Sequence, residues 1–352
     1  FWVYHKLNGK PQRVRLGKWP DLTVVQARAL ASKAVGQMAT GNDPNTKRRI
    51  DRTSPTFREM FDEFVKLPTR TRAKRPKSAK TIKDYRLQFE KYLAPWHDRK
   101  LSKVNRVNVE QLHNKLATSS GKYTANRVLS LIKALFNAAI DLEYLSDNPA
   151  THVRKFEETA RERYLTEDEL PRFFAALEEE PSEKVRDFVK LALFTGQRRG
   201  NVLAMKWEDV DMKRATWSIP QTKTGRHEVP LTQEAMDVLT RRLLEREDSE
   251  YVIPGRYDRG HLKDPMRQWR NILTRAGIED LRIHDLRRSL GSWQAITGAS
   301  LQIVGKTLGH SRPETTAIYS RLSDDPVRSA MHTATAAIVA ASKVTGEGAD
   351  DE

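Results

Sequence analysis

The chain has 352 residues, enough for two or three domains, and carries a formal net charge of +16. Residues 1–158 contain 17 more basic than acidic side chains, whereas residues 159–352 balance to −1. Such a basic block favours a polyanionic partner, nucleic acid ahead of a membrane surface, over a soluble protein that merely has basic loops. The absence of cysteine excludes disulfides, cysteine zinc sites and thiol nucleophiles.

Membrane and targeting signals are missing from the sequence. No apolar run approaches the ~18 residues that a membrane span needs, and no signal peptide is visible. We therefore expect a cytoplasmic protein without a membrane partner, which also fits the lack of cysteine. The chain begins at Phe1 instead of a methionine, so we expect its N-terminal module to be truncated.

Residues 1–45 are expected to form a small module of two strands and one helix. Aromatic and β-branched residues predict strands over 1–4 and 13–16, and Asn8-Gly9 between them is typical of a turn. Thr23 is placed to cap a helix that runs to about residue 39. This order predicts a short hairpin followed by one helix.

A polar, basic and proline-flanked linker over 46–55 leads into a second block, residues 56–150. Thr56 and Glu59 have the spacing of a capping box, in which each residue's side chain bonds the other's backbone N–H. Helical periodicity then recurs until Asn148-Pro149 ends the block. The sequence therefore predicts a small all-helical domain, with further helices over 79–93, 107–117 and 123–143.

The third block, residues 163–345, follows a charged linker over 151–162 and precedes a tail, 346–352, that we expect to be flexible. Thr166 and Glu169 again have capping-box spacing, which predicts a helix that begins near Thr166.

Helical patterns over 167–343 are interrupted by one strand–turn–strand signal, with strands predicted over 215–219 and 226–230. The whole chain is therefore predicted to be a multidomain protein that is mainly α with small β-sheets (α+β). Its last domain is expected to be mixed α/β.

Four short segments of the third block hold polar residues that could act together. Each is weak alone, since an arginine or a lysine in a turn ordinarily faces water and a tyrosine in a helical stretch ordinarily packs. His284 and Arg287 lie one turn apart on the polar side of an amphipathic helix. The segments are Thr195-Gly196-Gln197-Arg198-Arg199-Gly200, Thr222-Lys223-Thr224-Gly225, His284-Asp285-Leu286-Arg287-Arg288, and Leu308-Gly309-His310-Ser311, with Tyr319 nine residues after His310.

Taken in this order, the segments resemble the tyrosine recombinase (phage integrase) family over about residues 160–325. The family's catalytic set runs Arg, Lys, His-x-x-Arg, His or Trp, then Tyr. Gly200-Asn201 stands where many members have Ser-Glu, which we expect to affect packing and not the class of reaction. The positions that match the set are Arg198, Lys223, His284, Arg287, His310 and Tyr319.

The N-terminal blocks resemble other parts of the same family. Residues 56–150 resemble its helical, SAM-like core-binding domain. Residues 1–45 resemble the arm-binding module of integrases from prophages and genomic islands, through the pattern K-x-x-R-x-x-L-G-x-x-P from Lys10 to Pro20. The resemblance implies that the partners are double-stranded DNA at core and arm attachment sites and three further copies of the chain in a synaptic homotetramer. DNA-bending and excisionase proteins are implied accessories, at the bacterial nucleoid.

The resemblance also implies residue roles. Tyr319 would be the nucleophile, with Arg198 and Arg287 as a clamp on the phosphate, because an arginine fork binds two phosphate oxygens and stays protonated. His284 would act as base, and His310 would hold a non-bridging oxygen. Lys223, on a hairpin that can reach the leaving oxygen, would be the acid.

The implied function is site-specific recombination through a 3′-phosphotyrosine link, integrating or excising a mobile element. This scheme requires no metal ion and no cofactor. Two alternatives remain at this point. One is a type IB topoisomerase-like enzyme that nicks and closes DNA without strand exchange, and the other is a catalytically silent DNA-binding regulator.

Overall fold

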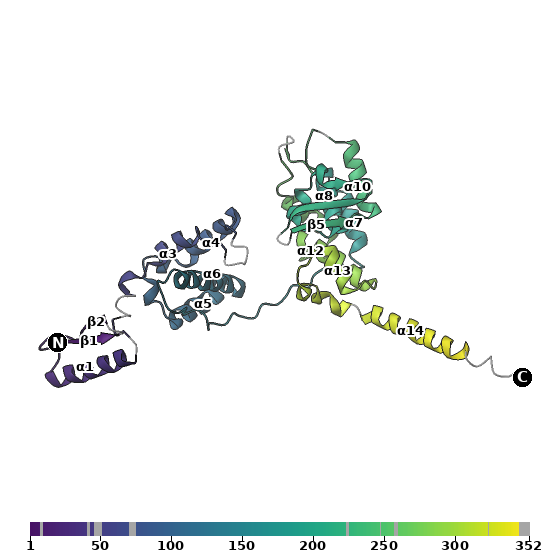
Figure 1. Ribbon diagram of the computed structural model, residues 1–352. Helices are drawn as coiled ribbons and strands as arrows, with labels where there is room; N and C mark the ends of the chain where they lie inside the picture. The colour runs from purple at the N-terminus through teal and green to yellow at the C-terminus, as the bar shows by residue number, and fades with distance from the viewer. Residues whose placement is uncertain are drawn as a thin grey trace, which may run out of the picture. The chain divides into compact units, whose positions relative to one another are not determined.

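The computed structural model forms two compact units, Phe1–Ala160 and Arg161–Glu352 (Figure 1). Within the described ranges, no helix is long and apolar enough to cross a membrane. The structure describes residues 1–7, 10–40, 43–45, 51–69, 75–222, 225–246, 248–256, 260–322 and 324–344.

The first unit begins with an antiparallel hairpin of strands β1 (Trp2–Leu7) and β2 (Lys10–Arg15) and the helix α1 (Val24–Ala39). The predicted strand–strand–helix order is confirmed, and the expected Asn8-Gly9 turn lies outside the described residues. Thr23 caps α1 in a capping box with Gln26. One face of the hairpin packs on the helix through a small apolar cluster that includes Val3, Val14, Ala34 and Met38.

The same unit continues with a helical bundle. Thr56 and Glu59 form the predicted capping box: the Glu59 N–H donates to Thr56 Oγ1 at 3.2 Å, and the Thr56 N–H donates to Glu59 Oε2 at 2.8 Å. In the core, the Phe61 and Phe89 rings stack with their centroids 4.1 Å apart. The elements are α3 (Phe57–Phe64), α4 (Ala79–Tyr92), η1 (Ala94–Trp96), η2 (Leu101–Lys103), α5 (Arg106–Ser120) and α6 (Lys122–Asp141).

The second unit is mostly helical around one antiparallel sheet of order β3-β4-β5, so the predicted class, mainly α with small sheets, is confirmed. Its strands are β3 (Val210–Asp211), β4 (Thr216–Thr222) and β5 (Gly225–Pro230). Its helices are α7 (Leu170–Glu178), α8 (Glu183–Thr195), α9 (Arg199–Leu203), η3 (Trp207–Asp209), α10 (Gln233–Leu244), α11 (Met266–Ala276), α12 (Ile283–Ile296), α13 (Leu301–Leu308), η5 (Pro313–Thr315), η6 (Ala317–Leu322) and α14 (Asp324–Val344).

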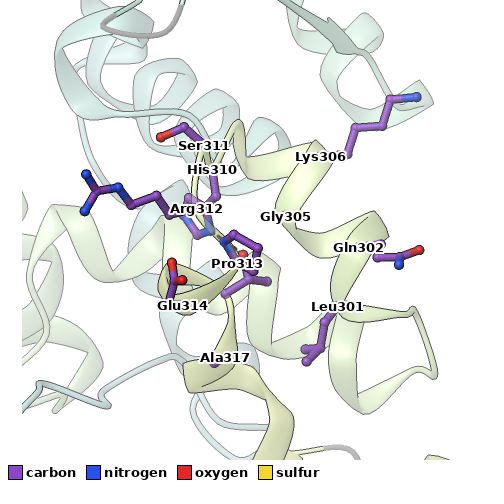
Figure 2. Close-up of a pocket in the computed structure, with 11 residues that line it drawn as sticks. Leu301, Gln302, Gly305, Lys306, His310, Ser311, Arg312, Pro313, Glu314 and Ala317 are labelled. Atoms are coloured by element: carbon purple, nitrogen blue, oxygen red, sulfur yellow. Dashed lines mark hydrogen bonds between the residues drawn. The ribbon is translucent and has the colours of Figure 1, made fainter. Parts of the chain in front are cut away.

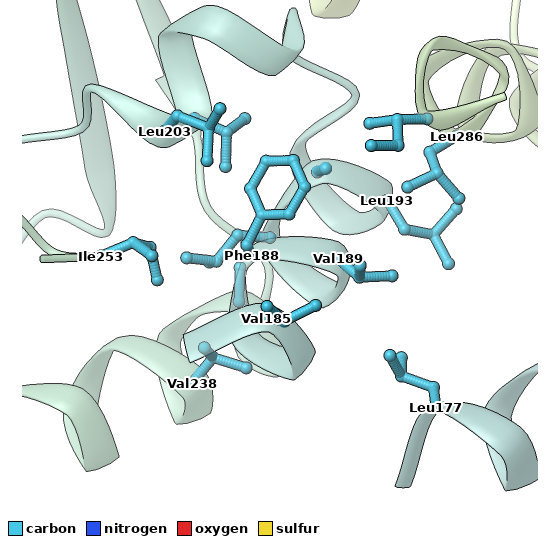
Figure 3. Packing of buried hydrophobic residues seen from close by; sticks show 14 of the residues in the cluster. Leu177, Val185, Phe188, Val189, Leu193, Leu203, Val238, Ile253 and Leu286 are labelled. Carbon is cyan, nitrogen blue, oxygen red and sulfur yellow. The ribbon is translucent and has the colours of Figure 1, made fainter. Parts of the chain in front are cut away.

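Helix α8 runs through the centre of the second unit's core (Figure 3). Its Val185, Phe188 and Val189 are fully enclosed by apolar side chains, among them Leu286 from α12 and Ile253 from the loop before α11. Burial of this kind stabilises the fold by about 1.5–3 kcal/mol for each large side chain. The packing therefore fixes α12 against α8. It also fixes the C-terminus of α8, which precedes Arg198, and the N-terminus of α12, which carries His284.

Two sequence expectations for this unit were wrong in detail. The helix predicted to begin near Thr166 begins at Leu170. Only half of the capping box forms, because Glu169 accepts the Thr166 N–H at 3.2 Å while the Thr166 hydroxyl donates to Asp168. The sheet also has a third strand, β3, which is only two residues long and therefore leaves no alternation in the sequence.

Candidate active site

Arg287 joins three segments of the second unit at one point. Its side chain is 4% exposed, and Nη1 donates to the Gly196 carbonyl at 2.9 Å while Nη2 donates to the Leu308 carbonyl. Both carbonyls lie at helix C-termini, those of α8 and α13, where unpaired C=O groups attract a cation. Arg287 is thus held rigidly between the two segments that precede Arg198 and His310.

Arg198 stands at the N-cap of α9, two residues beyond Gly196, with an exposed side chain. No hydrogen bond to another described residue engages its guanidinium, which leaves the fork open to an incoming anion. The preceding Gln197 is buried, and its amide donates to the Thr307 carbonyl at 2.9 Å. Gln197 therefore fixes the Arg198 turn against α13, a role that no local pattern in the sequence predicts.

His284 lies on the first turn of α12, exposed on the same helix as buried Arg287. The neighbouring Asp285 caps the helix by accepting the Arg282 N–H at 2.8 Å, and it pairs with Arg161 Nη2 at 2.9 Å. Arg161 also pairs with Asp280 at 2.7 Å. These contacts anchor the N-terminus of α12 and thereby fix the position of His284 on its first turn.

His310 follows the C-cap of α13, where its Nδ1 lies 2.9 Å from the hydroxyl of the buried Thr316. The cap residue, Gly309, has φ +62°, and a Cβ there would lie 3.0 Å from His227 Nε2. Only glycine combines that backbone conformation with such a close ring. The β4–β5 hairpin is thereby packed, through His227, on the turn that carries His310.

Tyr319 is 3% exposed and belongs to a small apolar cluster with Ala295, Val304 and Leu308. Its ring lies directly on α12 at Gly291, where a Cβ would come within 2.7 Å of Tyr319 Cζ. No residue type other than glycine at position 291 would leave room for the Tyr319 ring. The phenol is therefore held on the same helix as His284 and Arg287, one turn further along.

The ionisable groups of the site influence one another's pKa. Burial, then Arg287 and Arg198, lowers the pKa of His310 to about 4. Desolvation, then Arg287 and Arg288, lowers the pKa of His284, with a smaller contribution from Arg198 and an opposing one from Asp285. Burial lowers the pKa of Arg287 to about 10, which still leaves it charged at neutral pH. Both imidazoles are therefore neutral at pH 7, and His284 is able to accept a proton.

Tyr319 experiences two opposing effects. Burial raises the pKa of its phenol, while the positive charges of Arg287 and Arg288 lower it. Arg288 ends the segment His284–Arg288 that the sequence singled out, but no role was expected for it, because the family's catalytic set stops at Arg287.

Lys223 lies outside the described residues, so its position stays a prediction. The strands on either side of it are described, and His227 on β5 shows where the hairpin packs. Burial lowers the pKa of His227, as do the nearby Arg287 and Arg198, although a hydrogen bond to the Thr307 carbonyl opposes this. A third histidine thus borders the site without having been expected there.

A groove of about 670 Å³ opens beside His310, between α13 and the segment that follows it (Figure 2). Its lining is mostly apolar, with Leu301, Pro313 and Ala317 among the side chains. It shares only His310 and Thr316 with the residues described above. The groove is therefore a neighbour of the candidate site and not the place where the arginines and histidines gather.

Three family models match the chain. The phage integrase family matches residues 163–325, an arm DNA-binding domain matches residues 1–51, and the phage integrase N-terminal SAM-like domain matches residues 72–142. Residues 163–325 belong to the phage integrase family. The integrase domain contains all the side chains described above except Arg161, which lies two residues before it.

Similar proteins carry consistent names. The chain is 30% identical to the integrase of Salmonella phage P22 over 209 residues, 55% of this chain and 53% of that protein. It is 24% identical to the integrase of Enterobacteria phage P4, over 71% of this chain and 61% of that one. The chain thus spans between half and two thirds of the length of these relatives.

Solved structures share the fold. A lambda integrase tetramer bound to a Holliday junction matches with a TM-score of 0.62 at 21% identity, covering 90% of each chain. A Tn1549 transposon integrase bound to transposon right-end DNA matches with a TM-score of 0.65 at 15% identity, covering 80% of this chain and all of that one. At these identities the likeness concerns the fold.

Proposed function

We propose that the chain is a site-specific DNA recombinase that cleaves and rejoins strands through a 3′-phosphotyrosine intermediate. The observation that carries this proposal is the clustering of Arg198, His284, Arg287 and His310, with Tyr319 packed on the same helix as two of them. An anionic phosphodiester repels a nucleophile, and preorganised cations offset the charge that builds up on its oxygens. The two arginines supply that compensation here.

The proposed reaction begins with attack of Tyr319 Oη on the phosphorus. The new P–Oη bond forms as the bond to the 5′ oxygen breaks, His284 takes the phenolic proton, and Lys223 donates a proton to the leaving oxygen. Ionising a tyrosine at pH 7 costs about 4 kcal/mol, which the neighbouring arginines reduce. The tyrosyl ester retains the energy of the broken bond, so a 5′-hydroxyl reverses the step without ATP.

His310 would hold a non-bridging oxygen in this scheme. His310 Nδ1 lies 2.9 Å from the Thr316 hydroxyl, and we propose that this hydroxyl donates to it, so that the neutral ring carries its proton on Nε2 and can donate to the phosphate. The low pKa of His310 means that this role uses the neutral imidazole and adds no charge.

The experiment that tests the function supplies two matching attachment sites and looks for exchanged products. The two sites are placed on separate DNA molecules, and the buffer contains EDTA. A recombinase then yields products in which the DNA flanking the two sites has been exchanged. Relaxation of supercoils without exchange would instead indicate the topoisomerase-like alternative, and binding without adducts the silent regulator. Mapping the covalently linked nucleotide on the element's ends locates the sites to be used.

Lambda integrase forms a tetramer on a Holliday junction, and we propose four protomers here.

The arm module is proposed to bind DNA through the exposed face of its hairpin. On this face the cross-strand pairs Trp2–Arg15 and Tyr4–Arg13 place aromatic rings beside guanidinium groups, with Arg13 3.8 Å from the Trp2 ring centroid. A two-stranded ribbon fits the major groove of B-DNA, where arginines can reach bases or phosphates. The accessory bending and excisionase proteins and the bacterial cytoplasm likewise belong to this proposal.

Deleting residues 1–45 should weaken binding to arm sites far more than binding to core sites, as measured by electrophoretic mobility shift on separate probes. In the full chain, replacing Arg13 and Arg15 together by alanine should lower the slope of log Kd against log salt by about 2 on arm DNA, one for each phosphate contact. Lys33→Ala on the exposed side of α1 is the control. Equal losses on both probes would reject the arm assignment.

A further inference from the structure

A small cavity of about 140 Å³ lies beside Tyr319, on the side of α12 that carries Arg288. Its walls come from α12, from η6 and from the segment that enters the second unit, and they include Arg161, Glu162, Tyr164, Arg288, Ser292 and Tyr319. The volume suits a few water molecules or one small polar group. It is too small for a nucleotide, so any function must concern the groups that already line it.

The cations around the cavity differ in what they already bind. Arg161, which lines the cavity, is paired with Asp280 and Asp285. Arg287, which does not line it, donates to two backbone carbonyls. The acidic residue Glu162, which also lines the cavity, takes part in a further interaction. Arg288, by contrast, has a buried Nη1 with no hydrogen-bond partner. A buried charged donor without a partner is costly, and in native proteins it commonly marks a functional position.

The placement of Arg288 follows from the helix. Positions 284, 287, 288 and 291 lie on neighbouring turns of α12, and Tyr319 rests on Gly291. Both arginines act electrostatically on the phenol, and only Arg288 lines the cavity together with Tyr319. Both charges favour the ionised form of Tyr319 against the burial that opposes it.

We propose that Arg288 is a positioning residue for Tyr319, whose buried and unpaired Nη1 donor, beside the small cavity that both residues line, stabilises the phenolate before it attacks. The inference rests on the proposed function, because it takes Tyr319 as the nucleophile. It adds Arg288, a residue outside the six expected from the sequence, as one that favours the ionised form of Tyr319. The phenolic proton leaves to His284 as before, and Arg288 keeps its own proton throughout. No new bond is made by this residue.

The test measures the ionisation of residue 319 directly. Tyr319 is replaced by 3,5-difluorotyrosine, whose phenol ionises near neutral pH, and its absorbance is titrated in the full chain without DNA. Arg288→Met should raise the midpoint by about 1 pH unit, the lower end of the shift that a neighbouring opposite charge produces. Arg288→Lys should raise it less, because the charge remains while the fork is lost. Arg270→Met on the exposed face of α11 removes one charge as a control.

An unshifted midpoint in folded Arg288→Met protein would overturn the inference, and Arg288→Gln carries the same test if the methionine variant does not fold. Adduct formation on a suicide DNA substrate is the second readout. Below the midpoint the difluorotyrosine chain with Arg288→Met should react about tenfold more slowly, and above it the two rates should converge. A weaker DNA affinity with unchanged pH dependence would make Arg288 a phosphate contact instead, which also overturns the inference.

The two readouts separate this inference from the proposed function. A shifted midpoint without any adduct on DNA would reject the recombinase function while the effect of Arg288 on the phenol stands. Adducts that form with the same pH dependence in both proteins would uphold the function and reject the role of Arg288.

Discussion

Replacing Tyr319 by phenylalanine should abolish covalent protein–DNA adducts and leave DNA affinity within about threefold of the unmodified chain, a change of under 1 kcal/mol. The substitution removes the attacking oxygen and keeps the ring that packs on Gly291. Because no described residue forms a hydrogen bond with the Tyr319 hydroxyl, we expect the free energy of unfolding to change by less than about 1 kcal/mol. Adducts are measured on a nicked suicide substrate by denaturing gel electrophoresis.

Tyr164→Phe is the matched control, since Tyr164 lines the same small cavity. Adducts that persist in the Tyr319 variant but disappear in the Tyr164 variant would reassign the nucleophile. A loss of DNA binding in Tyr319→Phe would point to a folding defect, which far-ultraviolet circular dichroism distinguishes.

Arg287→Lys should reduce the rate of adduct formation by about 10²–10³-fold, the usual cost of removing one group that stabilises a developing oxyanion. A lysine keeps a charge but has no planar fork, so it cannot bind the Gly196 and Leu308 carbonyls and a phosphate oxygen together. Stability should fall as well, by about 1.5–3 kcal/mol for a lost charge-assisted hydrogen bond. Suicide-substrate kinetics and urea denaturation measure the two effects.

Arg270→Lys provides the control, because Arg270 lies exposed on α11 and outside the candidate site. The two losses are separable by temperature: a purely structural role would let the rate recover when the assay is run well below the unfolding midpoint. An unaltered rate in folded Arg287→Lys protein would remove Arg287 from the phosphate clamp.

Helix starts and ends were largely predictable because their causes are local. The Thr56–Glu59 box forms as expected, since all of its bonds join residues three positions apart. Thr166–Glu169 has the same spacing but fails as a box. There the Thr166 hydroxyl donates to Asp168 at 2.6 Å instead of capping the Glu169 N–H, and the helix begins at Leu170 beside Pro171, which suits a first helical turn. A competing carboxylate acceptor therefore removed half of the box.

The candidate site was predictable as a set of residue types and not as an arrangement. Periodicity placed His284 and Arg287 on the polar side of α12, which suggests two solvated side chains. In the structure Arg287 is buried, because two helix C-termini converge on it with unpaired carbonyls. The supporting contributions of Gln197, His227 and Arg288 could not be predicted from the sequence for the same reason. Each depends on a segment far along the chain.

The sequence by itself determined the class of protein and the chemical groups available to it, because motif order, charge distribution and caps are properties of short segments. Only the tertiary structure decided which of those groups face one another. Helix α12, fixed against α8 by the apolar core, brings the ends of α8 and α13 to Arg287 and leaves a glycine-sized space for Tyr319. Close packing transmits such positions across the chain, and no local pattern encodes them.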